Sequence, residues 1–228
     1  ILSTLETVFS MQDTAEITME ANPGTVEQGR FNEFHSIGIN RLSLGIQSFN
    51  DRHLKALGRI HDANEAHAAI QTARDAGFEN FNLDIMFGLP GQTLDEGLGD
   101  LDAALQHQPT HFSWYQLTLE PNTYFHVHPP TLPDDELIDT LFTAGQERLA
   151  TQGFSQYEVS AYAQQGRQCR HNLNYWEFGD YLGIGAGAHG KISDAQQQAI
   201  TRLAKVRHPK DYLDKAGTPA GIAEQRQL

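Results

Sequence analysis

The segment CRHNLNYW, residues 169–176, brings a thiol, an imidazole, carboxamides, a phenol and an indole close together in the sequence. A neutral imidazole such as that of His171 is a standard axial ligand of haem iron. The rings of Tyr175 and Trp176 can cover a face of a macrocycle. The other interpretation is an ordinary strand or loop whose rings fill a core.

A thiol–imidazole pair is a second chemical interpretation of the same segment. Cys169 would be a nucleophile and His171 its base, and on a strand their spacing places both side chains on one face. The sequence offers no clear third residue that would orient the imidazole. Ligation of haem iron by His171 is therefore the more specific of these two chemical interpretations.

Three glycines after this segment, Gly185, Gly187 and Gly190, match the dinucleotide-binding spacing G-x-G-x-x-G. No buried apolar strand precedes them, and the following KISDAQQQ is a poor first helical turn, so the context disfavours a Rossmann site. Glycines still permit close approach of the backbone to a flat ligand.

A second group of polar residues lies within apolar stretches of the first half. Glu20, Gln47 and Asp84 occupy three successive predicted strands, and Arg59 follows the second of them. Buried polar side chains are costly unless they are satisfied, so we expect them to form one polar site. Two carboxylates, an amide and a guanidinium suit a ligand with ribose hydroxyls and an ammonium–carboxylate group.

The elements that would position these residues alternate between strand and helix. Capping boxes mark three helix starts, Thr25 with Gln28, Asp62 with Glu65, and Thr93 with Glu96. This alternation predicts an α/β fold with a parallel sheet, either doubly wound or part of a barrel, with ligand groups past the carboxyl ends of the strands. The predicted strands are residues 16–23, 41–49, 81–91 and 111–121, and the predicted helices between them cover residues 25–39, 51–58, 62–78 and 93–108.

The second half of the chain has a different pattern. Residues 124–135 contain three prolines and are predicted to form a connector. Residues 134–154 are predicted to form a helix with acidic residues in its first turn, and residues 155–163 a strand.

Composition limits the classes of function. The chain has 228 residues, 39% of them hydrophobic, and a net charge of −13, which disfavours nucleic acid or an anionic membrane as a partner. The single cysteine suits a cytoplasmic protein. Because the chain starts at Ile1 and has no obvious terminus at Leu228, we expect it to be a fragment of a longer protein.

Six motifs together resemble one family over almost the whole chain. They are EANPGT, RLSLGIQSF, LGRIH, NLDIMFGLPGQT, YQLTLEP and HNLNYW. They resemble the HemW family, radical S-adenosylmethionine (SAM) proteins related to oxygen-independent coproporphyrinogen III oxidase. HNLNYW is similar to the H-N-x-x-Y-W motif of the haem chaperones, which the oxidase is expected to lack.

The resemblance implies part of a radical SAM (βα)6 partial TIM barrel, followed by the start of a smaller α+β region. The expected domains are residues 1–122, the C-terminal part of the barrel, and residues 123–228, which carry the haem motif. The family's C-x3-C-x2-C loop holds a [4Fe–4S] cluster. Its cysteines are absent from this chain, because Cys169 is the only cysteine.

The resemblance also assigns expected roles to residues. The SAM-binding residues would be Glu20, Gln47, Arg59 and Asp84, with Gln116 at a backbone contact to the cofactor. His171 would bind haem iron, with Asn172, Tyr175 and Trp176 as supporting residues. The implied cofactors are SAM, a [4Fe–4S] cluster with ligands outside this chain, and haem.

Two functions from different classes follow from the resemblance. In the first, the full-length protein is a haem chaperone that delivers haem to haem-requiring client proteins. In the second, it is an oxidoreductase of porphyrin biosynthesis that decarboxylates the propionates of coproporphyrinogen III. The expected partners of the chaperone are haem and its clients. A homodimer is compatible with the resemblance, nucleic acid is not expected, and membrane contact is expected only through clients.

Overall fold

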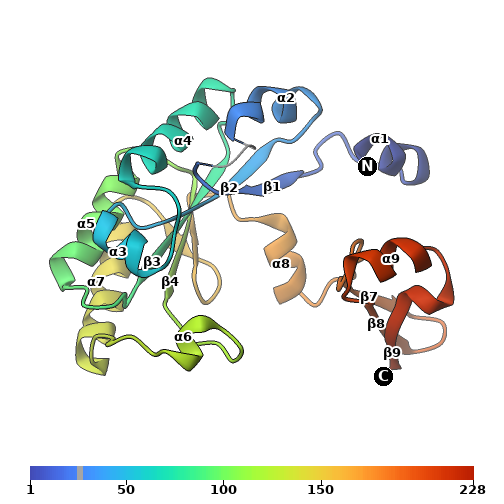
Figure 1. Ribbon diagram of the computed structural model, residues 1–228. Coiled ribbons are helices and arrows are strands. Elements are labelled where there is room, and N and C mark those ends of the chain that lie inside the picture. Colours follow the sequence, from blue (N-terminus) through green and yellow to red (C-terminus); the bar gives the residue numbers. More distant parts are fainter. Residues whose placement is uncertain (25–27) are drawn as a thin grey trace. The chain divides into compact units, whose positions relative to one another are not determined.

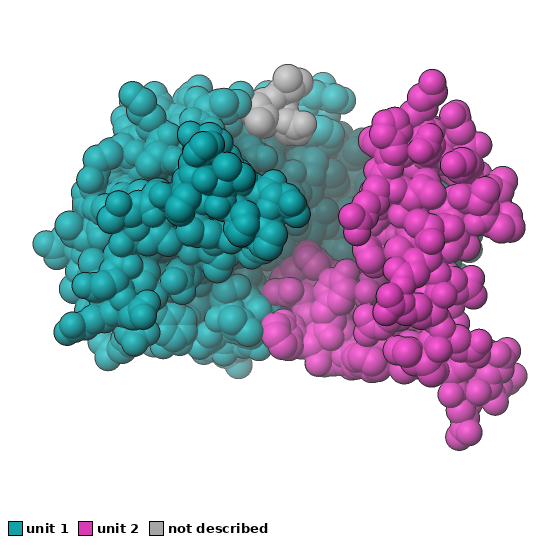
Figure 2. All heavy atoms as spheres, turned by 60° about the horizontal axis from the view of Figure 1, so that its bottom comes forward, with its two compact units in different colours: residues 1–168 teal, residues 169–228 magenta. Residues whose placement is uncertain are grey.

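The computed structural model describes residues 1–24 and 28–228, which form two compact units, residues 1–168 and 169–228 (Figure 2). The predicted capping box of Thr25 with Gln28 lies outside the described residues. The first unit continues past the sequence boundary expected at residue 122, because residues 123–168 belong to the same compact body as the preceding strands.

The first unit is built on one six-stranded sheet, which confirms the predicted α/β class with a parallel sheet. Its strand order is β1-β2-β3-β4-β6-β5, and the first four strands are parallel. β6 pairs antiparallel with both β4 and β5. The strands are β1 (Thr18–Ala21), β2 (Arg41–Gln47), β3 (Phe81–Phe87), β4 (His111–Gln116), β5 (Ser155–Gln156) and β6 (Ala161–Ala163).

Helices connect and flank these strands. The predicted capping boxes at Asp62 and Thr93 are confirmed, since both the side-chain and the reciprocal glutamate bonds are present. Within residues 1–24 and 28–228, no helix has both the length and the apolar character needed to cross a bilayer. The helices of this unit are α1 (Leu2–Val8), η1 (Gln28–Arg30), α2 (Phe31–Ser36), α3 (Asp51–Ala56), α4 (Ala63–Asp75), α5 (Leu94–Leu105), α6 (Tyr124–Val127) and α7 (Asp135–Thr151).

One face of the sheet carries the hydrophobic core. Side chains alternate between the two faces of a strand, and one set is fully buried and apolar. Helices α4, α5 and α7 cover this face (Figure 1). The opposite face therefore carries the polar residues of the same strands. The core residues of the strands include Leu42, Leu44, Ile46, Leu83, Ile85, Phe87, Phe112 and Trp114.

The second unit is a small α+β body. Its sheet has the antiparallel order β7-β8-β9. Its elements are α8 (Arg170–Trp176), β7 (His189–Asp194), β8 (Ala199–Lys205), α9 (Pro209–Lys215), η2 (Pro219–Gly221) and β9 (Ile222–Gln227).

Two local predictions for the second half were wrong. Residues 155–163 form two short strands joined by a turn, with the Tyr157 N–H bonded to the Ala161 carbonyl, rather than one strand. Cys169 and His171 do not share a strand face, because His171 lies in helix α8 and Cys169 is its N-cap. The predicted connector at residues 124–135 also includes the short helix α6, which Thr123 caps.

Two glycines of the helical layer lead to opposite predictions. A Cβ on Gly145 in α7 would lie 2.5 Å from the indole nitrogen of Trp114, whereas one on Gly99 in α5 meets nothing within 4 Å. We expect Gly145→Ala to lower the free energy of unfolding by about 1–3 kcal/mol through overpacking. Gly99→Ala should raise it by roughly 0.5–1 kcal/mol through helix propensity. Urea unfolding of both variants checks the predicted opposite signs, and equal effects would contradict this packing.

Candidate functional site

Polar residues cross the face of the sheet opposite the hydrophobic core. The strand register pairs Glu20 with Ser43, Ser43 with Asn82, and Asn82 with His111. Asp84 lies two residues beyond Asn82 in β3 and pairs with Ser113 of β4. The register of the parallel strands therefore gathers the predicted residues Glu20 and Asp84 on one polar face.

Asp84 is the most constrained carboxylate of this face. It accepts hydrogen bonds from Asn82 Nδ2 at 2.7 Å and from Ser43 Oγ at 3.4 Å. Burial raises the pKa of the Asp84 carboxyl, and hydrogen bonds from the Ser113 and Asn82 side chains oppose this increase. The negative charge of Glu20 adds to the increase in the pKa. The Asp84 carboxylate is thus held by side-chain donors in a buried setting that disfavours its negative charge.

Gln47, at the end of β2, has an unusual backbone. Its φ is +70°, in the left-handed region that non-glycine residues rarely adopt, and the register with β3 shifts between Leu44 and Gln47. Its side chain is buried, and its Oε1 accepts a 2.6 Å hydrogen bond from the Tyr115 hydroxyl. Burial raises the pKa of Tyr115 to about 12, so this hydroxyl keeps its proton at neutral pH.

The segments on both sides of Gln47 are held by side chains from other elements. His61 Nε2 lies 3.1 Å from the Ile46 carbonyl, which can only accept. Asp100 of α5 accepts from Ser48 Oγ and from the Phe49 N–H, both at 2.7 Å. Strained backbone of this kind persists where its surroundings fix it, and it clusters at functional sites.

The Asp100 carboxyl makes stability depend on pH. Burial raises its pKa from 3.8 to about 6, despite the hydrogen bonds from Ser48 and Phe49. Between these two values the folded state binds more protons than the unfolded state, so this contribution to stability is lost as the pH rises. A shift of roughly 2 pK units corresponds to about 3 kcal/mol.

Asp100→Asn should therefore flatten the change in unfolding free energy between about pH 4 and pH 7. An asparagine can still accept from Phe49 and donate to Ser48. Urea unfolding across this pH range measures the effect, and Asp95→Asn, an exposed residue of the same helix, is the control. A pH slope unchanged from the wild type would show that the burial of Asp100 does not set it.

Of the remaining predicted SAM residues, Arg59 is exposed near the polar face, whereas Gln116 is exposed on the side of β4 that also carries Phe112 and Trp114. Arg59 Nη1 is 3.3 Å from Asn22 Oδ1, and the guanidinium charge also acts on Tyr115, where it opposes the increase in pKa. Gln116, the last residue of β4, is exposed and lines a cleft of about 450 Å³. Most of the other lining residues of the cleft are aromatic or aliphatic and suit a flat apolar ring.

Helix α8 carries the residues of the predicted haem motif. His171 is exposed, and Tyr175 and Trp176 are 54% and 58% exposed. The thiol Sγ of Cys169, itself buried, lies 3.1 Å from Nδ1 of His171. The interpretation of this segment as core packing is therefore wrong for the two rings, which present most of their surface to solvent. Their exposure leaves them available to a ligand.

A buried lysine holds the turn that follows α8. Lys191 Nζ is 2.9 Å from both the Phe178 carbonyl and Asp180 Oδ1, and 4.2 Å from the centroid of the Phe178 ring. The Asp180 side chain also accepts from the Ser193 N–H at 2.8 Å, and these contacts lower the pKa of Asp180 to about 2. Asn174 donates to the Asp180 carbonyl at 3.1 Å. Asn174 of the motif thus has a structural role.

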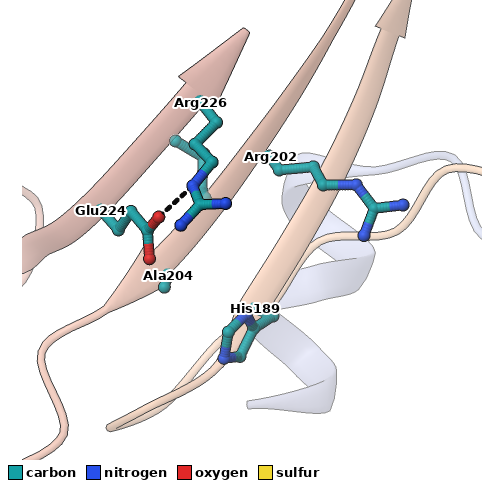
Figure 3. A pocket seen from close by; sticks show the side chains of 6 residues that line it. His189, Arg202, Ala204, Glu224 and Arg226 are labelled. Atoms are coloured by element: carbon teal, nitrogen blue, oxygen red, sulfur yellow. Dashed lines mark hydrogen bonds and ion pairs between the residues drawn. The ribbon is translucent and has the colours of Figure 1, made fainter. Parts of the chain in front are cut away.

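The glycine-rich segment leads into strand β7, whose first two residues are His189 and Gly190, and not into a helix. This disagrees with the dinucleotide-binding interpretation of the glycine spacing. The sheet that follows has a shallow cleft of about 240 Å³, where Arg226 pairs with Glu224 and Arg202 extends away from them (Figure 3).

Several residues of the polar face were not predicted from the sequence, namely Ser43, Asn82, His111, Ser113 and Tyr115. The signal was available, because N-x-D in β3 and H-x-S-x-Y in β4 repeat with a period of two. Interpreting residues 81–91 as a mostly apolar strand hides the alternation in β3. His61 was missed because its contact with Ile46 is formed only by folding.

The donor set fits SAM but not the cluster. Carboxylates, an amide with its orientation fixed by Tyr115, and a nearby guanidinium match the ammonium, hydroxyl and carboxylate groups of SAM. A [4Fe–4S] cluster held by cysteines needs more thiolates than the one that this chain contains.

Comparisons with known proteins identify the family that the chain resembles. Residues 4–104 match the radical SAM superfamily. The chain is 54% identical over 213 residues to the heme chaperone HemW of Haemophilus influenzae, covering 93% of the chain and 55% of that protein. It is 54% identical over 199 residues to the heme chaperone HemW of Escherichia coli K12, covering 87% and 52%. The chain thus spans about half the length of these relatives.

A solved structure shows the same fold. Coproporphyrinogen III oxidase (HemN) of Escherichia coli, a radical SAM enzyme, superimposes with a TM-score of 0.81 over 100% of the chain and 55% of that protein. The two sequences are 21% identical, so this likeness concerns the fold. Residues 4–104 thus belong to the radical SAM superfamily, and the chain is homologous to proteins named heme chaperone HemW.

Proposed function

We propose that the full-length protein is a haem chaperone that binds haem through His171 and delivers it to haem-requiring proteins. The observation that carries this proposal is helix α8, whose exposed histidine and two exposed rings occur in a chain closely similar to proteins named heme chaperone HemW. An imidazole nitrogen can ligate the iron. Tyr175 and Trp176 can pack against the macrocycle.

SAM is the second cofactor of this proposal, held on the polar face of the first unit. Arg59 would pair with the SAM carboxylate and Glu20 with its ammonium group. Gln47 and Asp84 would bind the ribose hydroxyls or the adenine, and Gln116 would contact the cofactor through its backbone. SAM bound to a [4Fe–4S] cluster is the source of radical chemistry in this superfamily, and the residues of this chain bind and orient it.

The experiment that tests the function compares delivery with turnover. The full-length protein, reconstituted with its cluster, is loaded with haem and mixed with an apo-haem protein, and transfer is followed by absorbance. The same preparation is incubated with coproporphyrinogen III, SAM and a reductant. We expect saturable haem binding and transfer without decarboxylation. Robust decarboxylation of the porphyrinogen, or the absence of a saturable haem complex, would contradict the chaperone function.

The partners follow from this function. We propose haem and haem-requiring client proteins as partners, with a homodimer as an assembly that size-exclusion chromatography with light scattering can detect. A single cysteine supports a cytoplasmic location. On this proposal contact with a membrane occurs through clients.

A further inference from the structure

A row of hydrogen bonds leads across the polar face to Asp84. Tyr157 lies between β5 and β6, and its hydroxyl is 2.7 Å from Nε2 of His111, which is 2% exposed. Nδ1 of the same ring is 2.6 Å from Asn82 Oδ1. Asn82 Nδ2 is in turn 2.7 Å from Asp84 Oδ1. The row thus connects a hairpin at the far edge of the sheet with a carboxylate on its third strand.

The chemistry of the groups gives this row one direction. An ionised carboxylate only accepts, so Asn82 must turn its NH2 group toward Asp84 and its carbonyl oxygen toward His111. That oxygen also only accepts, so Nδ1 of His111 carries the hydrogen. In a neutral imidazole the other nitrogen, Nε2, then accepts the hydroxyl hydrogen of Tyr157. Every donor in the row points toward Asp84.

We propose that His111 and Tyr157 are positioning residues for Asp84, and that their directed hydrogen bonds keep its carboxylate oriented and ionised to accept a hydrogen bond from SAM. This inference rests on the proposed function, in which Asp84 contacts SAM. It assigns a task to two residues that were not among the predicted site residues.

The cost of the arrangement supports a role in binding rather than in packing. His111 and Asn82 are each 2% exposed, on strands whose other face is apolar. Burying such polar groups in place of apolar ones is often neutral or unfavourable for stability, even when they are hydrogen-bonded. The same face also contains Ser43 and Ser113, both hydrogen-bonded to Asn82, so the amide is held from several sides.

The test uses Tyr157→Phe, which removes only the hydroxyl. SAM binding to the full-length, cluster-reconstituted protein is measured by calorimetry between about pH 5.5 and pH 8.5. We expect the dissociation constant at neutral pH to rise about 3- to 10-fold, from the loss of one hydrogen bond in the row. As the pH is lowered, the variant should lose SAM affinity at a higher pH than the wild type does. Without the Tyr157 hydroxyl, the ionised form of Asp84 is less stabilised, so this carboxyl binds a proton at a higher pH.

Three further variants separate positioning from structure. In an Asp84→Asn background, Tyr157→Phe should have no further effect on SAM affinity or on its pH profile. His111→Gln, whose amide can keep the donor–acceptor order, should retain more affinity than His111→Ala. Tyr162→Phe, a core tyrosine of β6, is the matched control and should leave the pH profile unchanged.

The outcomes distinguish this inference from the function on which it rests. If the wild-type protein does not bind SAM, both are overturned. If the wild type binds SAM but Tyr157→Phe weakens binding equally with and without Asp84, or leaves the pH profile unchanged, the positioning role is overturned and the SAM site remains.

Discussion

Replacing Trp176 by alanine is expected to weaken haem binding and leave the fold almost unchanged. The indole is 58% exposed at the end of α8, so its removal should change the free energy of unfolding by less than about 0.5 kcal/mol. If the ring packs on the macrocycle, its loss should raise the haem dissociation constant roughly tenfold, or about 1.4 kcal/mol. Haem titration and urea unfolding of one sample measure both quantities.

Trp114→Ala is the matched substitution and should behave in the opposite way. Trp114 is fully buried, stacks on Phe87 and packs against Gly145. Its removal should cost about 3–5 kcal/mol of stability. A large loss of stability in Trp176→Ala, with no change in haem affinity, would contradict a role of Trp176 in haem binding and would show that the ring stabilises the fold by packing.

Arg59→Ala is expected to have the largest effect on SAM binding. Arg59 is exposed beside Asn22, so its removal should leave the fold intact. A charged hydrogen bond to the SAM carboxylate contributes about 1.5–3 kcal/mol, so the dissociation constant should rise roughly 10- to 150-fold. The effect should shrink as the salt concentration rises, because exposed charges are screened. Equilibrium binding at two salt concentrations in the reconstituted full-length protein measures it.

The control for this prediction is Arg74→Ala. Arg74 lies in α4 and donates to the His107 carbonyl at 2.9 Å, away from the polar face. The Arg74→Ala substitution removes the same positive charge from the same unit. If both variants weaken SAM binding equally, the effect comes from net charge, and the assignment of Arg59 to the carboxylate is contradicted.

Much of the first unit could be predicted from local signals. The capping boxes of Asp62 with Glu65 and of Thr93 with Glu96 each depend on residues only three positions apart, and both form as expected. Each of the four parallel strands lies within its predicted range, because apolar β-rich runs were separated by clear turn residues. Tertiary contacts could not be predicted in this way. The positive φ of Gln47 depends on Tyr115, Asp100 and His61, which lie 14 to 68 residues away in the sequence.

The second unit shows where local patterns mislead. HNLNYW contains bulky aromatic residues that suit a strand as well as a helix, and it folds as the short helix α8. The turn after this helix is fixed by Lys191, a charged residue whose burial the sequence did not indicate. Exposure of Tyr175 and Trp176 was equally unpredictable from hydrophobicity, because large rings are usually buried.

The measurement that tests the central claim most directly is a haem titration of the full-length protein beside its His171→Ala variant, followed by Soret absorbance. His208→Ala serves as the control, because His208 is another exposed histidine of the same unit. We predict a saturable Soret shift for the wild type and for His208→Ala, and a strongly weakened one for His171→Ala. An identical shift in all three proteins, with circular dichroism showing that each is folded, would contradict haem ligation by His171.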